Sequence, residues 1–175
     1  MRSSQHLIRP FRMEFRNFVN PMIDIVDPSK RSEMMSGIRA KNTSPEILVR
    51  KILFSTGLRF RLHRRDLPGV PDIILPRYHV AIFVHGCFWH MHAGCRLARI
   101  PQSNVTFWRK KLEGNRERDQ KNIRQLVDLG WRVLVVWECS TKSDALLGKL
   151  ANEINSWLLS EEKTAEIPVC LPSSP

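Results

Sequence analysis

The sequence predicts an α/β fold in which helices flank a mixed central sheet, and three observations support this prediction. Two apolar runs, HVAIFV from His79 and WRVLVVW from Trp131, are typical of buried strands. Between them, residues 104–129 have the apolar spacing of a long helix, and a strand that follows such a helix implies a crossover connection. Finally, 175 residues with 42% hydrophobic content are enough for one domain with a core of its own.

The N-terminal segment, residues 1–21, contains four Arg and one Glu without clear periodicity, which predicts a disordered basic extension. The same composition fits a transit peptide, or a coding start placed upstream of a true start at Met22. The folded domain is expected to cover residues 22–160, and residues 161–175 are expected to be a flexible tail.

Helix signals open the expected domain. A short helix is expected to start at Asp27 or Ser29 and to end at about residues 37–41. In the next segment Ser44 suits an N-cap and Gly57 suits a left-handed helix stop, so a second helix is expected between them.

Strand signals follow. Extended segments begin at Leu58, Pro71 and His79, and the short links between them predict a hairpin or a meander. The long helix and the WRVLVVW strand come next, and residues 144–159 have the pattern of a last amphipathic helix.

The formal net charge is +11 and the sequence pI is about 10.2, so the surface is strongly basic. Such a surface favours a polyanionic partner, because each Lys or Arg near a phosphate releases condensed counterions. A basic surface that binds nothing is the alternative. No apolar run approaches the ~20 residues of a membrane span, and no signal peptide is evident, so we expect a chain that is neither secreted nor membrane-bound.

One segment combines ligands for a soft metal. Cys87, His92 and Cys95 have the spacing C-x4-H-x2-C, and Cys139 ends the WRVLVVWEC segment. Three thiolates and one imidazole suit tetrahedral zinc, and four protein ligands make the site structural. Such a zinc would staple the loop at residues 84–99 to the last predicted strand.

Two other interpretations of these cysteines stay open. The thiols could simply pack in the core, or Cys87 and Cys95 could form a disulfide in an oxidising compartment. Cys170 lies alone in the expected tail and has no predicted role.

Acidic and histidine side chains form a second group. Asp72 begins an apolar strand, His85 ends the next one, and Asp119 falls on the apolar stripe of the long helix. Asp72 is suited to bind Mg²⁺, which prefers oxygen ligands, or else is a turn or cap residue. Asp119 needs a partner, and Arg116 or Arg118 could supply a structural one.

Four ordered motifs, LPGVPDIIL, IFVHGCFWHMH, FWRKKLEGNRERD and LGWRVLVVWEC, resemble the very-short-patch-repair (Vsr) DNA mismatch endonucleases, over residues 24–159. The resemblance implies a restriction-endonuclease-like core, a structural zinc, and Mg²⁺-dependent nicking of one strand beside a T:G mismatch left by deamination of 5-methylcytosine. It further implies a bacterial cytoplasmic, nucleoid-associated enzyme that acts as a monomer on double-stranded DNA, with mismatch-repair proteins as further partners.

The resemblance also assigns roles by position. The zinc ligands fall on the residues already selected by spacing, Cys87, His92, Cys95 and Cys139. The magnesium ligands fall on the Asp72 side chain and the Val84 backbone carbonyl. The remaining catalytic positions are His90 beside the attacking water, His85 and Asp119 as an outer pair that orders water, and Glu46 nearby.

The aromatic residues that the resemblance assigns to wedging between base pairs are Phe88, Trp89 and Trp108, for which core packing is the alternative. Core packing is our prediction for Trp131 and Trp137.

The sequence departs from the family pattern in one short stretch. Val84 replaces a Thr, Met91 replaces a His, and Ala93 with Gly94 lengthens the spacing before Cys95. Two competing functions stay open, a zinc-stapled DNA-binding module without chemistry and a restriction nuclease on the same core. A DNA-binding module without chemistry would not need Asp72, His85, His90 and Asp119 together.

Overall fold

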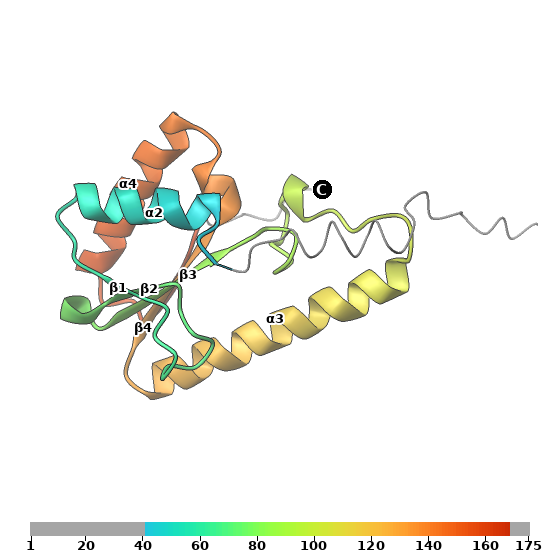
Figure 1. Ribbon diagram of the computed structural model, residues 1–175, viewed down its shortest axis with the longest axis horizontal. Coiled ribbons are helices and arrows are strands. Elements are labelled where there is room, and N and C mark those ends of the chain that lie inside the picture. The colour runs from blue at the N-terminus through green and yellow to red at the C-terminus, as the bar shows by residue number, and fades with distance from the viewer. Residues whose placement is uncertain (1–40, 169–175) are drawn as a thin grey trace, which may run out of the picture.

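The computed structural model describes residues 41–168, and these residues form the predicted α/β fold. A five-stranded sheet lies between two helices on one face and a long helix on the other, as Figure 1 shows. The expected basic extension, the expected helix between residues 27 and 41, and Cys170 lie outside the described residues. Within the described range, no helix is both long and apolar enough to cross a membrane.

The sheet is mixed, as predicted. Its order is β1-β2-β3-β4-β5, with β1–β2–β3 antiparallel and β3–β4–β5 parallel. The strands are β1 (Arg61–Leu62), β2 (Ile73–Leu75), β3 (Val80–His85), β4 (Arg132–Trp137) and β5 (Thr164–Ile167). Between β2 and β3 a single 3-10 turn ends at His79, whose left-handed φ of 53° reverses the chain and produces the predicted meander.

The first described helix is α2 (Ser44–Ser55). Its N-cap is Thr43, one residue before the predicted Ser44, because Thr43 forms a capping box with the Glu46 side chain. Gly57 follows the helix with a φ of 81°, as its predicted role as a stop requires.

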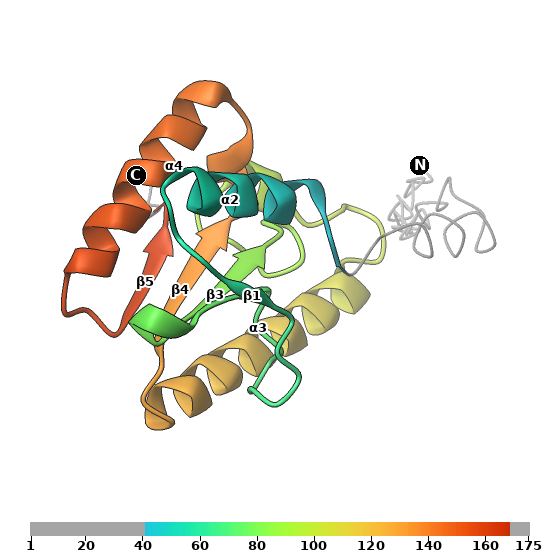
Figure 2. The same cartoon turned by 60° about the vertical axis from the view of Figure 1, so that its left-hand side comes forward.

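Two further helices cover the sheet. α3 (Val105–Asp128) is the predicted crossover helix between β3 and β4 and lies on the face opposite α2 and α4 (Figure 2). α4 (Asp144–Leu159) has the bounds that the sequence predicts, and the hydroxyl of Ser143 caps its first turn by accepting from the Leu146 N–H.

Side chains of successive residues of β3 enter two separate core layers. Ile82 packs with α2 and α4, whereas Phe83 packs with α3, because neighbouring residues of a strand point to opposite faces. Trp131 and Trp137 are buried, so the prediction that both pack in the core is confirmed.

The expectation of a flexible tail from residue 161 onward is wrong for residues 164–167. These residues form β5, which pairs in parallel with β4 at the edge of the sheet (Figure 2). Ile167 is buried, while the rest of the strand is partly or fully exposed. One buried apolar residue in a four-residue strand leaves too short a pattern to recognise, since the pairing partner comes from far away in the sequence.

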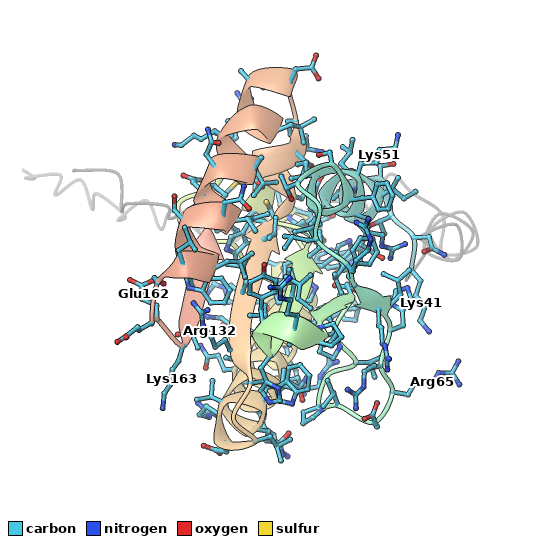
Figure 3. All side chains as sticks on the ribbon, turned by 90° about the vertical axis from the view of Figure 1, so that its left-hand side faces the viewer. Lys41, Lys51, Arg65, Arg132, Glu162 and Lys163 are labelled. Atoms are coloured by element: carbon cyan, nitrogen blue, oxygen red, sulfur yellow. The ribbon has the colours of Figure 1, made fainter. Side chains whose placement is uncertain are left out.

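Arg132 caps the C-terminal end of α4, where helix carbonyls lack partners within the helix. Its guanidinium donates to the carbonyls of Trp157 at 2.7 Å and Leu158 at 3.2 Å, and its Nε donates to the carbonyl of Glu162 at 2.9 Å. Figure 3 shows Arg132 and Glu162 on the same side of the molecule.

We predict that Arg132→Gln lowers the free energy of unfolding by about 2 kcal/mol, because charge-assisted hydrogen bonds to the helix carbonyls are lost. Chemical denaturation measures the change. Lys51→Gln, which removes a charge from the exposed side of α2, is the control. Equal stability of the two variants would contradict a role for Arg132 in holding α4.

Candidate functional site

A cleft of about 650 Å³ opens between the start of α2, the ends of β2 and β3, and the middle of α3. All residues that the sequence analysis selected for catalysis or magnesium binding line it: Glu46, Asp72, Val84, His85, His90 and Asp119. These residues come from four segments that are far apart in the sequence, and the fold brings them together.

Asp72 lies directly before β2 and is fixed by β3. Its Oδ2 accepts from the backbone N–H of Val84 at 2.8 Å. In an extended strand the N–H and C=O of one residue point to the same side, so the Val84 carbonyl also faces the Asp72 side. Burial raises the pKa of Asp72 to about 6, which outweighs the opposing hydrogen bond from Val84. A cation beside this carboxylate would favour its charged form.

The second part of the cleft joins His90 to Asp119. Nδ1 of His90 lies 2.5 Å from Oδ2 of Asp119. The partner of Asp119 is therefore a histidine, not Arg116 or Arg118. His85, which the resemblance pairs with Asp119, belongs to the same group, since ligand atoms of His85, His90 and Asp119 lie within 4.8 Å of one another. The His85 ring also stacks on His90, with ring centroids 3.8 Å apart.

The two histidines have distinct roles in this geometry. A carboxylate accepts hydrogen bonds, so the contact with Asp119 favours the His90 tautomer that carries its proton on Nδ1 and leaves Nε2 as an acceptor. Burial lowers the pKa of His85 to about 3, with a further contribution from His90. His85 is therefore a neutral ring that packs against His90 and limits its rotation.

Glu46 is held by several partners on the α2 side of the cleft. Its Oε1 accepts from the Thr43 hydroxyl at 2.9 Å, and its Oε2 accepts from Arg50 Nη2 at 2.6 Å. The same Arg50 nitrogen lies 3.3 Å from Nε2 of His63. A ligand atom of His63 lies within 4.8 Å of those of Glu46 and Asp72.

Sequence reasoning missed Arg50 and His63. The spacing of Glu46 and Arg50, four residues apart on a helix, is a recognisable signal for an ion pair. His63 carries no such signal, because it follows a two-residue strand and comes close to Glu46 and Asp72 only through the pairing of β1 with β2.

The four residues predicted to bind zinc form a second cluster. Ligand atoms of Cys87, His92, Cys95 and Cys139 lie within 4.8 Å of one another. Nδ1 of His92 lies 3.5 Å from both Cys87 Sγ and Cys139 Sγ. No disulfide joins any of these three cysteines to another, so the alternative of a Cys87–Cys95 disulfide is not realised.

Burial shifts the pKa values of the ligands in this cluster, and a bound cation would offset the shift of the thiols. Burial raises the pKa of Cys87, and the neighbouring Cys139 and Cys95 add to the cost of a charged thiolate. Burial also lowers the pKa of His92, whose ring stacks on Trp137 with centroids 4.1 Å apart. Adjacent thiols and a neutral imidazole are the donor set of a closed zinc site, and a cation would relieve the cost of their ionisation.

Aromatic side chains form a third group beside the cleft. Phe88 contacts Trp89 and Trp108 with centroid separations of 5.0 and 5.4 Å. These three rings are half-buried and pack against each other rather than in the core layers of the sheet. Sequence reasoning missed Phe107, which is 58% exposed and extends the group, although it directly precedes Trp108.

One cationic side chain lies over these aromatic rings, and others lie elsewhere on the surface. Lys111 Nζ lies 5.5 Å from the ring centre of Trp89 and 5.7 Å from that of Trp108. Lys41, Lys51 and Arg65 project from one side of the molecule in Figure 3. A chain with a net charge of +11 therefore places at least one of its cations against aromatic rings. Nucleic-acid binding uses this combination of positive charge and aromatic rings.

Comparison with known proteins identifies the family. The family model of the DNA mismatch endonuclease Vsr matches residues 23–96. The chain is 49% identical over 132 residues to the "Type II nicking enzyme V.XorIIP" of Xanthomonas oryzae pv. oryzae, which covers 75% of this chain and 96% of that relative. It is 38% identical over 148 residues to the "DNA mismatch endonuclease Vsr" of Escherichia coli, which covers 83% of this chain and 94% of that relative. The chain therefore belongs to the Vsr family of DNA mismatch endonucleases.

Proposed function

We propose that this endonuclease nicks one strand of double-stranded DNA beside a T:G mismatch that arises from deamination of 5-methylcytosine. The observation that carries the proposal is the meeting of Asp72, His90 and Asp119 in one cleft next to half-buried aromatic rings. A DNA-binding module without chemistry would not need a hydrogen-bonded His–Asp pair beside a buried carboxylate. The substrate lies in the bacterial nucleoid, so a nucleoid-associated location and contact with mismatch-repair proteins follow from the proposal.

Mg²⁺ is the proposed cofactor of the cleft, and Asp72 with the Val84 carbonyl would hold it. When bound, such an ion neutralises charge on the phosphate and favours an ionised nucleophile. The half-buried Asp72 fits this role, because its charged form contacts the Val84 N–H and has only more distant charges besides it.

His90 is the proposed general base. Asp119 holds the proton on Nδ1 and orients the ring, so Nε2 can take a proton from a water in the cleft. His85 supports the ring through stacking. Glu46 is held by Thr43 and Arg50, so its proposed role is to shape the charge of the cleft rather than to move a proton.

Zinc is the proposed occupant of the cysteine–histidine cluster. We predict one zinc per chain and a Cys139→Ala variant that lacks it, with a free energy of unfolding lower by about 4 kcal/mol or more, since loss of a structural metal is among the largest single effects. Elemental analysis and thermal melting measure both. Cys170→Ala is the matched cysteine control. A zinc-free wild type that melts at the same temperature as Cys139→Ala would disprove the zinc assignment.

Asp72→Ala should abolish nicking and leave DNA binding largely unchanged, because it removes a cation ligand but no basic or aromatic surface. His90→Ala should slow nicking by about 10²- to 10⁴-fold. Single-turnover nicking and gel-shift assays test both, with Asp66→Ala, which removes an exposed carboxylate from the β1–β2 loop, as control.

Two outcomes would contradict the proposal. An unchanged nicking rate in Asp72→Ala would mean that Asp72 is not the cation ligand of the reaction. Equal cutting of fully paired and T:G duplexes by wild type would favour a restriction nuclease.

Phe88, Trp89 and Trp108 are the proposed wedge. Cys87 and His92 flank the first two, so a loop held at both ends presents rings that are already ordered before DNA binds. Insertion between base steps costs a few kcal/mol of unstacking, and this cost is lowest at a poorly stacked T:G pair. The rings would therefore contribute to the selection of the mismatch.

We predict that replacing Phe88 and Trp89 together by Ala weakens nicking of a T:G duplex much more than binding of a fully paired duplex. Both quantities are measured on one protein preparation. Phe54→Ala, which removes a 62% exposed aromatic ring from α2, is the matched control. Equal losses on the two duplexes would exclude a wedge that senses the mismatch.

A further inference from the structure

Arg50 lies among three groups that have the composition of a metal site. Glu46, His63 and Asp72 offer ligand atoms within 4.8 Å of one another. The guanidinium of Arg50 contacts two of the three, since Nη2 lies 2.6 Å from Glu46 Oε2 and 3.3 Å from His63 Nε2. A positive charge therefore already stands between two of the groups that could ligate an ion.

The contacts of Arg50 hold its charge firmly in this place. Its Nη1 donates to Asn42 Oδ1 at 2.7 Å, and its side chain is only 13% exposed. A guanidinium only donates hydrogen bonds and stays protonated, so the 3.3 Å contact makes Nε2 of His63 the acceptor. The ring nitrogen that faces Glu46 and Arg50 is thus engaged by a cation that cannot lose its proton.

The chain position of His63 brings its ring close to Glu46 and Asp72, which line the cleft. Its backbone N–H donates to the carbonyl of Asp72 at 3.4 Å, which extends the antiparallel pairing of β1 with β2. Residues directly opposite each other in such a pair place their side chains on the same face. His63 also has a left-handed φ of 48°, an uncommon conformation for a residue other than Gly.

We propose that Arg50 takes the place of a divalent cation on the Glu46 side of the cleft, and that Glu46, His63 and Asp72 form a latent metal site that Arg50 keeps closed. The charge of Arg50 compensates Glu46, whose side chain is 4% exposed, so Glu46 does not need a metal ion as its counterion. This inference rests on the proposed function in one respect, that Asp72 holds the cation of the nuclease.

The physical reason for expecting a latent site is the cost of an unpaired buried charge. When one partner of a buried ion pair is removed, the other must lose its charge or acquire a new counterion. Without Arg50, Glu46 would be left beside His63 and Asp72, which supply an imidazole and a second carboxylate. Mn²⁺ accepts carboxylate and imidazole ligands and is therefore a suitable probe.

The test is the number of Mn²⁺ ions bound per zinc-loaded chain, measured from the electron paramagnetic resonance signal of free Mn²⁺. We expect wild type to bind one ion, Asp72→Ala to lose it, and Arg50→Gln to bind a second. Lys51→Gln, which changes the net charge equally on the next residue of α2, should still bind one. Arg50→Lys keeps the charge and should also bind one.

Adding His63→Ala to Arg50→Gln should weaken the second Mn²⁺ by at least about 10-fold, because loss of a direct ligand should cost no less than loss of a residue that only supports a ligand. Because Arg50→Gln leaves a buried charge, its melting temperature should also rise more with added Mn²⁺ than that of wild type. This second measurement applies even to a variant that is poorly folded without metal.

The possible failures are distinguishable. If Arg50→Gln binds only one ion and its melting temperature rises with Mn²⁺ no more than that of wild type, the latent site is wrong while the nuclease site at Asp72 stands. A second ion in Lys51→Gln or Arg50→Lys would likewise overturn the role of Arg50. If Asp72→Ala binds Mn²⁺ like wild type, the proposed nuclease site itself fails.

Discussion

The parallel pairing of β3 with β4 is the interaction on which both proposed metal sites depend. In this pairing His85 lies opposite Trp137, so the two strands end at the same level. Cys87 lies two residues beyond His85, and Cys139 lies two residues beyond Trp137. Parallel strands place their carboxyl ends at one edge of the sheet, where ligand sites of α/β folds commonly form. The ladder thus explains how a cysteine so distant in the sequence joins the cluster.

The loop that follows β3 couples the three functional groups. Within it, Cys87 and His92 belong to the cysteine cluster, Phe88 and Trp89 to the aromatic group, and His90 to the cleft. The backbone N–H of His92 donates to the Cys87 carbonyl at 3.0 Å, which makes the loop a tight turn. Neighbouring residues of one turn therefore belong to different sites. An ion in the cysteine cluster would fix the position of His90, the proposed general base, relative to the aromatic rings.

The electrostatics of the cleft follow from burial. Glu46 is a buried carboxylate and Asp72 is a half-buried one, and such charges are costly without a partner. Glu46 is compensated by Arg50, whereas burial raises the pKa of Asp72 to about 6. The two carboxylates therefore differ: Arg50 neutralises Glu46, whereas Asp72 is suited to bind a cation from solution.

Local sequence patterns determined much of this protein. The bounds of α4, the central α3 and the buried β3 and β4 follow from apolar spacing, because helices and strands of this length repeat their pattern several times. The set Cys87, His92, Cys95 and Cys139 followed from residue type and spacing, since few other roles need three thiols and an imidazole.

Only the tertiary structure decided the features that join distant segments. It assigned Asp119 to His90, placed Arg50 against His63, and added residues 164–167 to the sheet. None of these has a signature in the sequence, because each depends on which segments become neighbours after the chain has folded. A periodic pattern records only whether a residue faces inward; the identity of the group that it meets there is set by sheet order, strand register and the path of the crossover helix.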